Sequence, residues 1–277
     1  MTIRRILVVG APRSGTTLVQ SVLAAHPDVT SFTESHFFDK AWGAGGRRFR
    51  PREASQRLAD FVAANGLESL REEMPALAAA RTVASPLVTG RAFLDLLDAA
   101  AVARRCTCWV EKTPDHVLRL DLLRQMDASL RFVHVVRRPA DAIASLHVAT
   151  RRWGHPRSWL RCALHWRLAV AATRGVLANP RHTVVMYERI TADPEAEARR
   201  LIQWIGLPWR DEVLTQYRTA ARELVGDEES WKSRNLQEIA PRAERPLATL
   251  PWTARAALTG ATAYEAISRF DGQESRE

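Results

Sequence analysis

The sequence predicts an α/β fold, in which a central, mostly parallel sheet of about four or five strands lies between two layers of helices. Short apolar runs alternate along the chain with longer amphipathic segments, which is typical of β-α units. The clearest runs are apolar at every position, as in parallel strands that are buried on both faces. No internal repeat or low-complexity linker interrupts the pattern, so we expect one domain over residues 1–277.

The first β-α unit begins with a strand over 6–9, where all four residues are apolar, and this strand ends at Gly10. A helix is predicted over 14–26, because its apolar residues recur on one face, and it stops before Pro27. The residues on that face are Leu18, Val22 and Leu23. A second, short strand is expected over 28–33.

From 34 to 105 the chain is mostly helical, with a loop at 43–52 and turns near Gly66 and Pro86. Further apolar runs predict strands at 107–110, 130–136 and 182–186. Amphipathic segments predict helices at 114–126, from Pro139 onward, and at 158–178, 194–205, 210–225 and 251–268. We expect the helical insertion at 34–105 and a polar lid segment at about 226–250 to shape a substrate pocket.

Composition excludes several classes of protein. The chain carries a net charge of +9 and is rich in arginine, with lysine only at three positions: Lys40, Lys112 and Lys232. Its one dense basic cluster, 47–52, lies in a glycine-rich loop without the aromatic-lined stripe of a nucleic-acid surface, so an anionic cofactor or acidic substrate is the expected partner. No apolar run is long enough to span a membrane, and the first apolar run breaks at Gly10, too early for the core of a signal peptide, so we expect a cytoplasmic protein.

The three cysteines are too few for a disulfide framework. Cys106 and Cys108 have the spacing of two metal ligands, but no second pair of cysteines or histidines stands at a useful distance. We therefore expect structural thiols and no metal.

Three segments directly follow predicted strands: 10–17, 111–116 and 137–145. Ligands bind at the carboxyl ends of strands in such sheets, so these segments are expected to form the site. The first, Gly10-Ala11-Pro12-Arg13-Ser14-Gly15-Thr16-Thr17, has the glycine spacing of a Walker A loop between a strand and a helix. Backbone N–H groups and the helix dipole make such a loop an anion site.

The loop lacks the lysine of a Walker A sequence, because Thr16 stands at that position and Arg13 supplies a cation instead. NTPases also hold Mg²⁺ with an aspartate that follows a later strand. Here the strand 130–136 is followed by Arg137. These departures disfavour a kinase, and a tight strand-to-helix turn without a ligand is the simplest alternative.

With Pro12-Arg13-Ser14-Gly15-Thr16-Thr17, the sequence resembles the sulfotransferases that use 3′-phosphoadenosine-5′-phosphosulfate (PAPS). The cytosolic branch has a lysine where Arg13 stands, and an arginine there is similar to the tyrosylprotein sulfotransferases and many bacterial members. The resemblance implies a P-loop-like fold. It also implies that this loop binds the 5′-phosphosulfate through Arg13, Ser14, Gly15, Thr16 and Thr17.

The segment Arg137-x-Pro139-x-Asp141-x-x-x-Ser145 is similar to the 3′-phosphate site of this family, where the arginine and the serine hold the phosphate. An arginine at a strand exit offers a planar fork for phosphate oxygens, and Pro139 suits the first turn of a helix. An exposed arginine without a ligand is the alternative when this segment is taken alone.

Two more elements follow from the resemblance. The segment Tyr187-Glu188-x-x-x-x-Asp193-Pro194 resembles one whose tyrosine contacts adenine, and a core tyrosine is the competing interpretation. A basic C-terminal segment often closes over the cofactor in this family, and Lys232 and Arg234 are the candidates here.

Sulfuryl transfer requires cations around the transferring group and a base for the acceptor hydroxyl. Arg13 and Lys112 are the expected cations, and Lys112 resembles a lysine that many members carry after this strand; a solvated lysine is the alternative. The expected base is Glu34, at the separation from Arg13 that tyrosylprotein sulfotransferases use, with a raised pKa through burial against neighbouring phenylalanines. A helix-capping glutamate is the alternative.

The cytosolic branch uses a histidine as base, at the position that is Pro114 here, so His36 and His116 are kept as substitutes. These residues together predict direct, metal-free transfer from PAPS to a hydroxyl or phenol of a small molecule or peptide. Two rivals are a P-loop kinase and a nucleotide-binding protein without activity. Aromatic side chains of 36–105 and 147–180 are expected to wall the acceptor pocket, and the dimer motif of the cytosolic branch is absent.

Overall fold

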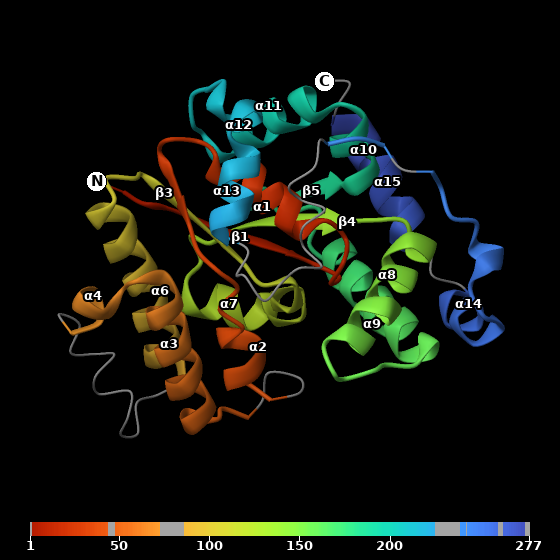
Figure 1. Cartoon of the computed structure of the whole chain (residues 1–277), viewed down its shortest axis with the longest axis horizontal. Coiled ribbons are helices and arrows are strands. Elements are labelled where there is room, and N and C mark those ends of the chain that lie inside the picture. Colours follow the sequence, from red (N-terminus) through yellow and green to blue (C-terminus); the bar gives the residue numbers. More distant parts are fainter. Residues whose placement is uncertain are drawn as a thin grey trace.

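The computed structural model describes residues 2–43, 48–72, 86–224, 239–241, 243–259 and 263–274. Within these ranges, five strands form one parallel sheet in the order β2-β3-β1-β4-β5 (Figure 1). The strands are β1 (Arg4–Gly10), β2 (Val29–Ser31), β3 (Cys108–Lys112), β4 (Arg131–Val136) and β5 (His182–Met186). The predicted α/β fold with a parallel sheet between helical layers is therefore confirmed.

The central strand β1 is buried on both faces because its apolar side chains alternate between two cores. Ile6 and Val8 belong to one apolar cluster, and Leu7 and Val9 belong to the other. This explains the uninterrupted apolar run in the sequence, since a strand covered on both sides has no face for polar residues.

Helices cover both faces of the sheet, and in Figure 1 α11, α12 and α13 lie above it while α2, α3 and α6 lie below. The cluster around Ile6 contains residues of α1 (Thr16–Ala24), α10 (Tyr187–Ala192), α11 (Pro194–Ile205), α12 (Glu212–Thr215) and α13 (Tyr217–Leu224). The cluster around Leu7 contains residues of α2 (Phe37–Ala41), α3 (Pro51–Asn65), α6 (Pro86–Ala103), α7 (Leu120–Met126), α8 (Pro139–Arg152), α9 (Trp159–Arg174), α14 (Trp252–Leu258) and α15 (Ala263–Glu274).

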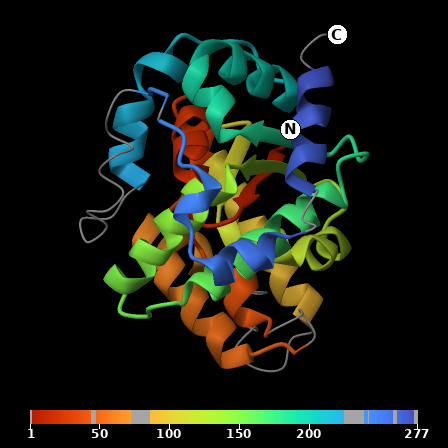
Figure 2. The same ribbon diagram turned by 90° about the vertical axis from the view of Figure 1, so that its right-hand side faces the viewer.

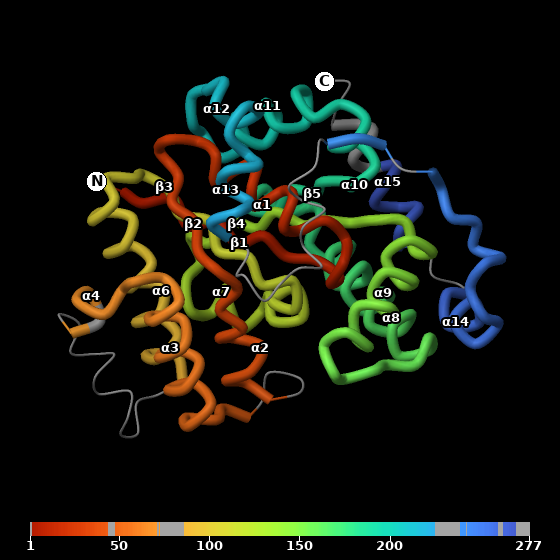
Figure 3. The backbone as a smooth tube through the Cα atoms, in the orientation of Figure 1, coloured from red at the N-terminus to blue at the C-terminus, as the bar shows by residue number. Residues whose placement is uncertain are grey.

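Segments distant in the sequence meet on both faces. The backbone trace shows α13 beside α1, and the view turned by 90° shows the C-terminal α14 near α9; both pairs are in contact (Figures 2 and 3). A short helix α4 (Glu68–Glu72) follows α3. The described residues contain no helix that is both long and apolar enough to cross a membrane.

Several predicted boundaries were wrong. The strand expected at 107–110 extends to Lys112, so Glu111 and Lys112 lie within the sheet. The helix expected from Pro114 begins as a 3₁₀ helix, η2 (Pro114–Arg119), before α7. The helix expected at 210–225 is two helices, and α10 directly after β5 was not predicted. At the C-terminus, η4 (Leu247–Thr249) precedes two separate helices where one was expected.

His134 on β4 has a structural role. Its Nδ1 lies 3.0 Å from Thr173 Oγ1, and its Nε2 lies 2.9 Å from Nδ1 of His182. Burial, with the neighbouring His182, lowers the pKa of His134 to about 3, so the ring is neutral. The three cysteines are free and buried, as expected of structural thiols, and burial raises the pKa of Cys108 to about 12.

Candidate active site

The loop between β1 and α1 has the backbone geometry of an anion site. Arg13 and Gly15 both adopt left-handed conformations, with φ of 73° and 97°. The N–H of Ser14 donates to the carbonyl of Ala11 at 3.1 Å, which closes a tight turn directly before the first helical residue, Thr16. The loop therefore delivers the chain to the N-terminus of a nine-residue helix, where backbone N–H groups favour an anion.

Side chains from the exit of β4 contact this loop. Arg13 Nε donates to Ser145 Oγ at 3.3 Å, and Arg137 Nη1 donates to the carbonyl oxygen of Arg13 at 3.3 Å. Ser145 lies on α8, which starts at Pro139 and follows Arg137 at once. The two segments that the sequence assigned to two phosphates of one nucleotide are thus in direct contact.

Tyr187 joins the same group from the exit of β5. The guanidinium of Arg137 lies 4.3 Å from the centre of the Tyr187 ring, a cation–π contact. A Cβ atom on Gly15 would lie 2.3 Å from Cδ2 of this ring. Tyr187 is mostly buried, so it packs against the loop and the core at once.

This packing predicts the effect of a single methyl group. Gly15→Ala should destabilise the protein by about 1–3 kcal/mol, because the added Cβ overlaps the Tyr187 ring and the residue has positive φ. Urea denaturation measures the loss. Gly66→Ala is the matched control, since Gly66 has φ 62° but nothing within 4 Å of the added Cβ. An equal loss in the free energy of unfolding in both variants would show that the positive φ alone causes it and that the contact with the Tyr187 ring does not contribute.

One polar atom of the loop fits a bound anion. The Ser14 hydroxyl has no exposed surface, and its oxygen has no hydrogen-bond partner among the described residues. Buried hydroxyls are nearly always hydrogen-bonded in folded proteins, so such an atom at a helix N-terminus is typical of a ligand position. A phosphate or sulfate oxygen would satisfy it, with Arg13 close by as the cation.

Glu34 and Lys112 form an ion pair at the ends of neighbouring strands. Lys112 Nζ donates to Glu34 Oε1, and the lysine side chain is only 1% exposed. Glu34 follows β2, and Lys112 ends β3, which lies between β2 and β1 in the sheet. The alternative of a solvated lysine is therefore wrong. Glu34 does not cap a helix either, because the cap position before α2 is His36.

The surroundings of Glu34 differ from the expected apolar wall. His36 Nε2 lies 3.3 Å from Glu34 Oε2, so two basic side chains contact this carboxylate. Phe32, Phe37 and Phe38, which were expected to bury this carboxylate, belong to the apolar core.

The histidines kept as substitute bases are poorly suited to that role. Burial acts to lower the pKa of His36, but hydrogen bonds and charges of Asp39 and Glu34 outweigh it and raise the pKa to about 10. The ring is therefore already protonated at neutral pH. His116 has no exposed surface and lies between Glu111 and Asp39, at 3.2 and 3.8 Å.

The sequence did not identify Glu111 as part of this site. Its side chain is wholly buried, and its Oε1 accepts hydrogen bonds from Ser35 and Thr113. Burial acts to raise its pKa, but His116, Thr113 and Ser35 outweigh it and lower the pKa below the usual value. A glutamate next to Lys112 in an otherwise apolar strand was the signal that could have revealed it.

Two groups of predicted residues do not contribute to the described site. Four aromatic side chains expected to wall an acceptor pocket are core residues with at most 2% exposure: Phe37, Phe38, Trp42 and Trp166. They cannot offer an open surface to a substrate, so the expectation was wrong for these four residues. Trp153 and Trp159 are half-buried, and the assignment of 36–105 and 147–180 to the pocket wall stays a prediction. Lys232 and Arg234 lie outside the described residues.

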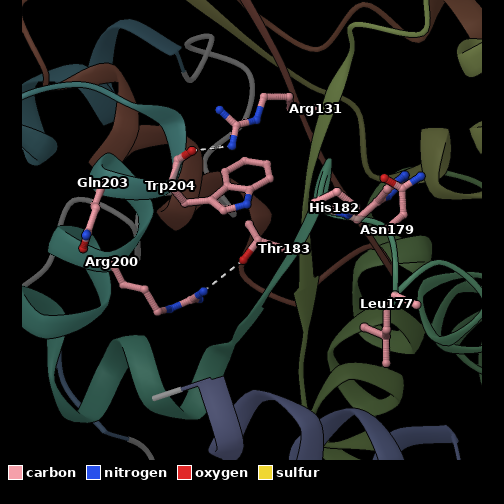
Figure 4. A pocket seen from close by; sticks show the side chains of 10 residues that line it. Arg131, Leu177, Asn179, His182, Thr183, Arg200, Gln203 and Trp204 are labelled. Carbon is pink, nitrogen blue, oxygen red and sulfur yellow. Dashed lines mark hydrogen bonds between the residues drawn. The ribbon is translucent and has the colours of Figure 1, made fainter. Parts of the chain in front are cut away.

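A pocket of about 750 Å³ lies at the amino-terminal ends of the strands, beside the first residues of β4 and β5 (Figure 4). Its arginines serve the framework. Arg131 donates to the carbonyls of Trp204 and Ile205 at the C-terminus of α11, and Arg200 donates to Thr183 Oγ1 at 2.9 Å. Since their donors are used in this way, the pocket offers no comparable anion site.

Known proteins share both the sequence pattern and the fold. The sequence profile of the sulfotransferase family matches residues 5–211. Protein-tyrosine sulfotransferase 1 of Danio rerio is 26% identical over 80% of this chain, and nodulation protein NoeE of Sinorhizobium fredii is 28% identical over 72%. The matched parts make up 57% and 49% of those two relatives, so the chain spans about half of their length.

Solved structures agree on the fold. The sulfotransferase domain of the Synechococcus PCC 7002 olefin synthase superposes with a TM-score of 0.61, at 17% identity, and covers 94% of this chain and 95% of that one. Mouse sulfotransferase SULT7A1, complexed with PAP, superposes with a TM-score of 0.56 at 12% identity. The match covers 100% of this chain and 90% of the mouse chain. The profile match covers most of the chain, and on this evidence the chain belongs to the sulfotransferase family.

Proposed function

We propose that this protein is a PAPS-dependent sulfotransferase that transfers a sulfuryl group directly to a hydroxyl or phenol. One observation carries the proposal. Arg137, which follows β4, contacts both Arg13 after β1 and Tyr187 after β5, around a loop with the geometry of an anion site. The Glu34–Lys112 pair lies at the carboxyl ends of β2 and β3, next to β1 in the same sheet. Family membership supports the same reaction.

The loop after β1 and the residues that follow β4 and β5 would together hold the donor nucleotide. Residues 13–17 face the 5′-phosphosulfate, with Arg13 as the cation and Ser14 as a buried hydroxyl donor. Arg137 and Ser145 face the 3′-phosphate. Tyr187 lies beside both and offers a ring for adenine. The mouse sulfotransferase structure contains PAP, which is 3′,5′-ADP, the nucleotide that remains when PAPS has lost its sulfuryl group. The arrangement here would bind the same nucleotide.

The remaining pair would perform the transfer. The acceptor hydroxyl gives its proton to the Glu34 carboxylate as its oxygen forms a bond to sulfur. The bond from sulfur to the bridging oxygen breaks, and its electron pair stays on the 5′-phosphate of 3′,5′-ADP. Lys112 and Arg13 neutralise the charge that develops on these oxygens. No covalent enzyme intermediate is needed.

The two rival functions fit the residues less well. A kinase needs a lysine where Thr16 stands and a metal-binding carboxylate where Arg137 follows β4. A protein that binds nucleotide without activity has no use for a lysine with 1% exposure that ends on a carboxylate at the ligand edge. Burial of such a pair is costly, so we expect it to serve the reaction.

Three nucleotides distinguish these functions in a thermal-shift experiment. At 100 times its dissociation constant, a ligand adds about 2.7 kcal/mol to the free energy of unfolding. We expect this stabilisation from 3′,5′-ADP, and a much smaller one from 5′-ADP or from ATP with Mg²⁺ at matched concentration. Stabilisation by ATP with Mg²⁺ alone would contradict the proposal and favour a kinase.

The acceptor is proposed to be a small molecule or peptide that presents a hydroxyl or phenol. The name of the Danio rerio relative describes a sulfotransferase for protein tyrosine, which supports a phenolic acceptor. The reaction is proposed to take place in the cytoplasm, as the sequence predicts.

A further inference from the structure

His36 adopts a strained backbone conformation next to the proposed base. Its φ is 48°, in the left-handed region that residues other than glycine seldom adopt. Its backbone N–H donates to Thr113 Oγ1 at 3.2 Å, and Thr113 Oγ1 donates in turn to Glu111 Oε1 at 2.6 Å. Strain of this kind persists where surrounding contacts impose it, and it gathers at functional sites.

Glu111 is the anchor of this turn. Besides the Thr113 hydroxyl, its Oε1 accepts the Ser35 N–H at 3.2 Å and the Ser35 hydroxyl at 2.8 Å. Ser35 lies between Glu34 and His36, so a wholly buried carboxylate on β3 fixes the segment that carries both residues. A buried carboxylate with several donors is rigid, since losing any donor leaves its charge poorly compensated.

The turn places the His36 ring between two carboxylates. Nε2 lies 3.3 Å from Glu34 Oε2, and Nδ1 lies 3.4 Å from Asp39 Oδ2. Lys112 contacts the other oxygen of Glu34. Each oxygen of Glu34 therefore has a basic partner from a different element, and the orientation of the carboxylate is fixed on both sides.

We propose that His36 is a positioning residue for Glu34 and that Glu111 holds the turn that makes this contact possible. The inference rests on the proposed function, in which Glu34 receives the proton of the acceptor. A basic partner on each oxygen holds the Glu34 carboxylate in one orientation, which a general base needs if it is to meet an acceptor hydroxyl at the right geometry.

Charged groups face His36 from four elements. Glu34 comes from the turn after β2, Asp39 from α2, Asp115 from η2 and Lys112 from β3. The three carboxylates favour the protonated ring and Lys112 opposes it. Burial also lowers the pKa of His36, yet hydrogen bonds with Asp39 and Glu34 raise it to about 10. The contact between His36 and Glu34 is thus an ion pair across the neutral range.

Nuclear magnetic resonance of the ¹⁵N-labelled histidine rings tests the inference without an acceptor. The His36 signals are identified by their absence in His36→Asn, because asparagine tolerates the left-handed conformation. In the wild type, the His36 ring should stay protonated far above the ordinary range of histidine. In Glu34→Gln its titration should move down by about one pH unit or more, since a neighbouring negative charge is lost.

Thr113→Val tests the anchor, because it removes the hydroxyl between His36 and Glu111 with little change in shape. We expect the His36 titration to move down here too, while stabilisation by 3′,5′-ADP persists. Thr215→Val on α12 is the matched control and should leave the titration unchanged. Glu111→Gln should preserve it, because the amide oxygen can accept the same hydrogen bonds.

An ordinary His36 titration in the wild type, or one that neither Glu34→Gln nor Thr113→Val moves, would overturn the inference. A failure of the proposed function looks different. In that case 3′,5′-ADP stabilises none of the proteins, whatever the histidine signals show.

Discussion

Glu34→Gln is expected to lower kcat by about 10²- to 10⁴-fold, which is the usual contribution of a general base. The amide cannot take the proton of the acceptor, but its oxygen can still accept the hydrogen bond from Lys112. That buried lysine therefore keeps a partner, and the fold should persist. Release of 3′,5′-ADP from PAPS, in the presence of a phenolic acceptor found by screening, measures the loss.

The affinity of Glu34→Gln for 3′,5′-ADP should change little, because the carboxylate does not belong to the nucleotide cluster. Glu195→Gln is a matched control, since Glu195 is exposed and pairs with Arg199 on the surface of α11. Loss of 3′,5′-ADP binding in Glu34→Gln would mean that Glu34 supports the structure of the site rather than the chemistry. Full activity would exclude it as the base.

Arg137→Ala should weaken binding of 3′,5′-ADP by about 10- to 100-fold, since a hydrogen bond to a charged group contributes about 1.5–3 kcal/mol. Its guanidinium also lies over Tyr187 and donates to the loop carbonyl of Arg13, so the variant removes a contact from each phosphate region. Isothermal titration calorimetry with 3′,5′-ADP and 5′-AMP separates these contributions. The loss should be larger for 3′,5′-ADP, because 5′-AMP lacks the 3′-phosphate.

Arg138→Ala is the neighbouring control. Arg138 pairs with Glu244 and is about one third exposed, so its removal should alter neither affinity by more than a few-fold. Equal losses for both nucleotides in Arg137→Ala would show that this arginine supports the loop and does not read the 3′-phosphate.

The parallel sheet could be predicted because its signals are local. A strand buried on both faces must be apolar throughout, as Ile6 to Val9 are, and a following Gly10 ends it. The loop at 10–17 was also predictable, since its glycines and hydroxyl residues lie within eight consecutive positions. The contact of Arg13 with Ser145 joins residues 132 positions apart, and only the resemblance to a family placed them at one ligand.

The contacts that join the polar residues around Glu34 could not be predicted. Glu111 lies in an otherwise apolar strand, and its partners come from the turn after β2, from η2 and from Thr113 directly before η2, so no sequence pattern connects them. The surroundings of Glu34 were expected to be aromatic because phenylalanines are its neighbours in the sequence. Phe37 and Phe38 instead pack into the core and leave the carboxylate to Lys112 and His36.

Segment boundaries failed where tertiary contacts override local preference. The sheet extends through Glu111 and Lys112 because a lysine and a glutamate can be buried there in ion pairs. Lys232, Arg234 and most of the lid expected at 226–250 lie outside the described residues, and the division of the chain into one domain stays a prediction.

We propose that one nucleotide binds at the carboxyl ends of β1, β4 and β5. A crystal structure with 3′,5′-ADP tests it most directly. We expect the 5′-phosphate on residues 13–17 with an oxygen at the Ser14 hydroxyl, the 3′-phosphate on Arg137 and Ser145, and no contact between the nucleotide and Glu34. A nucleotide bound elsewhere, such as in the pocket beside Arg131 and Trp204, or a 3′-phosphate that Arg137 does not touch, would contradict it.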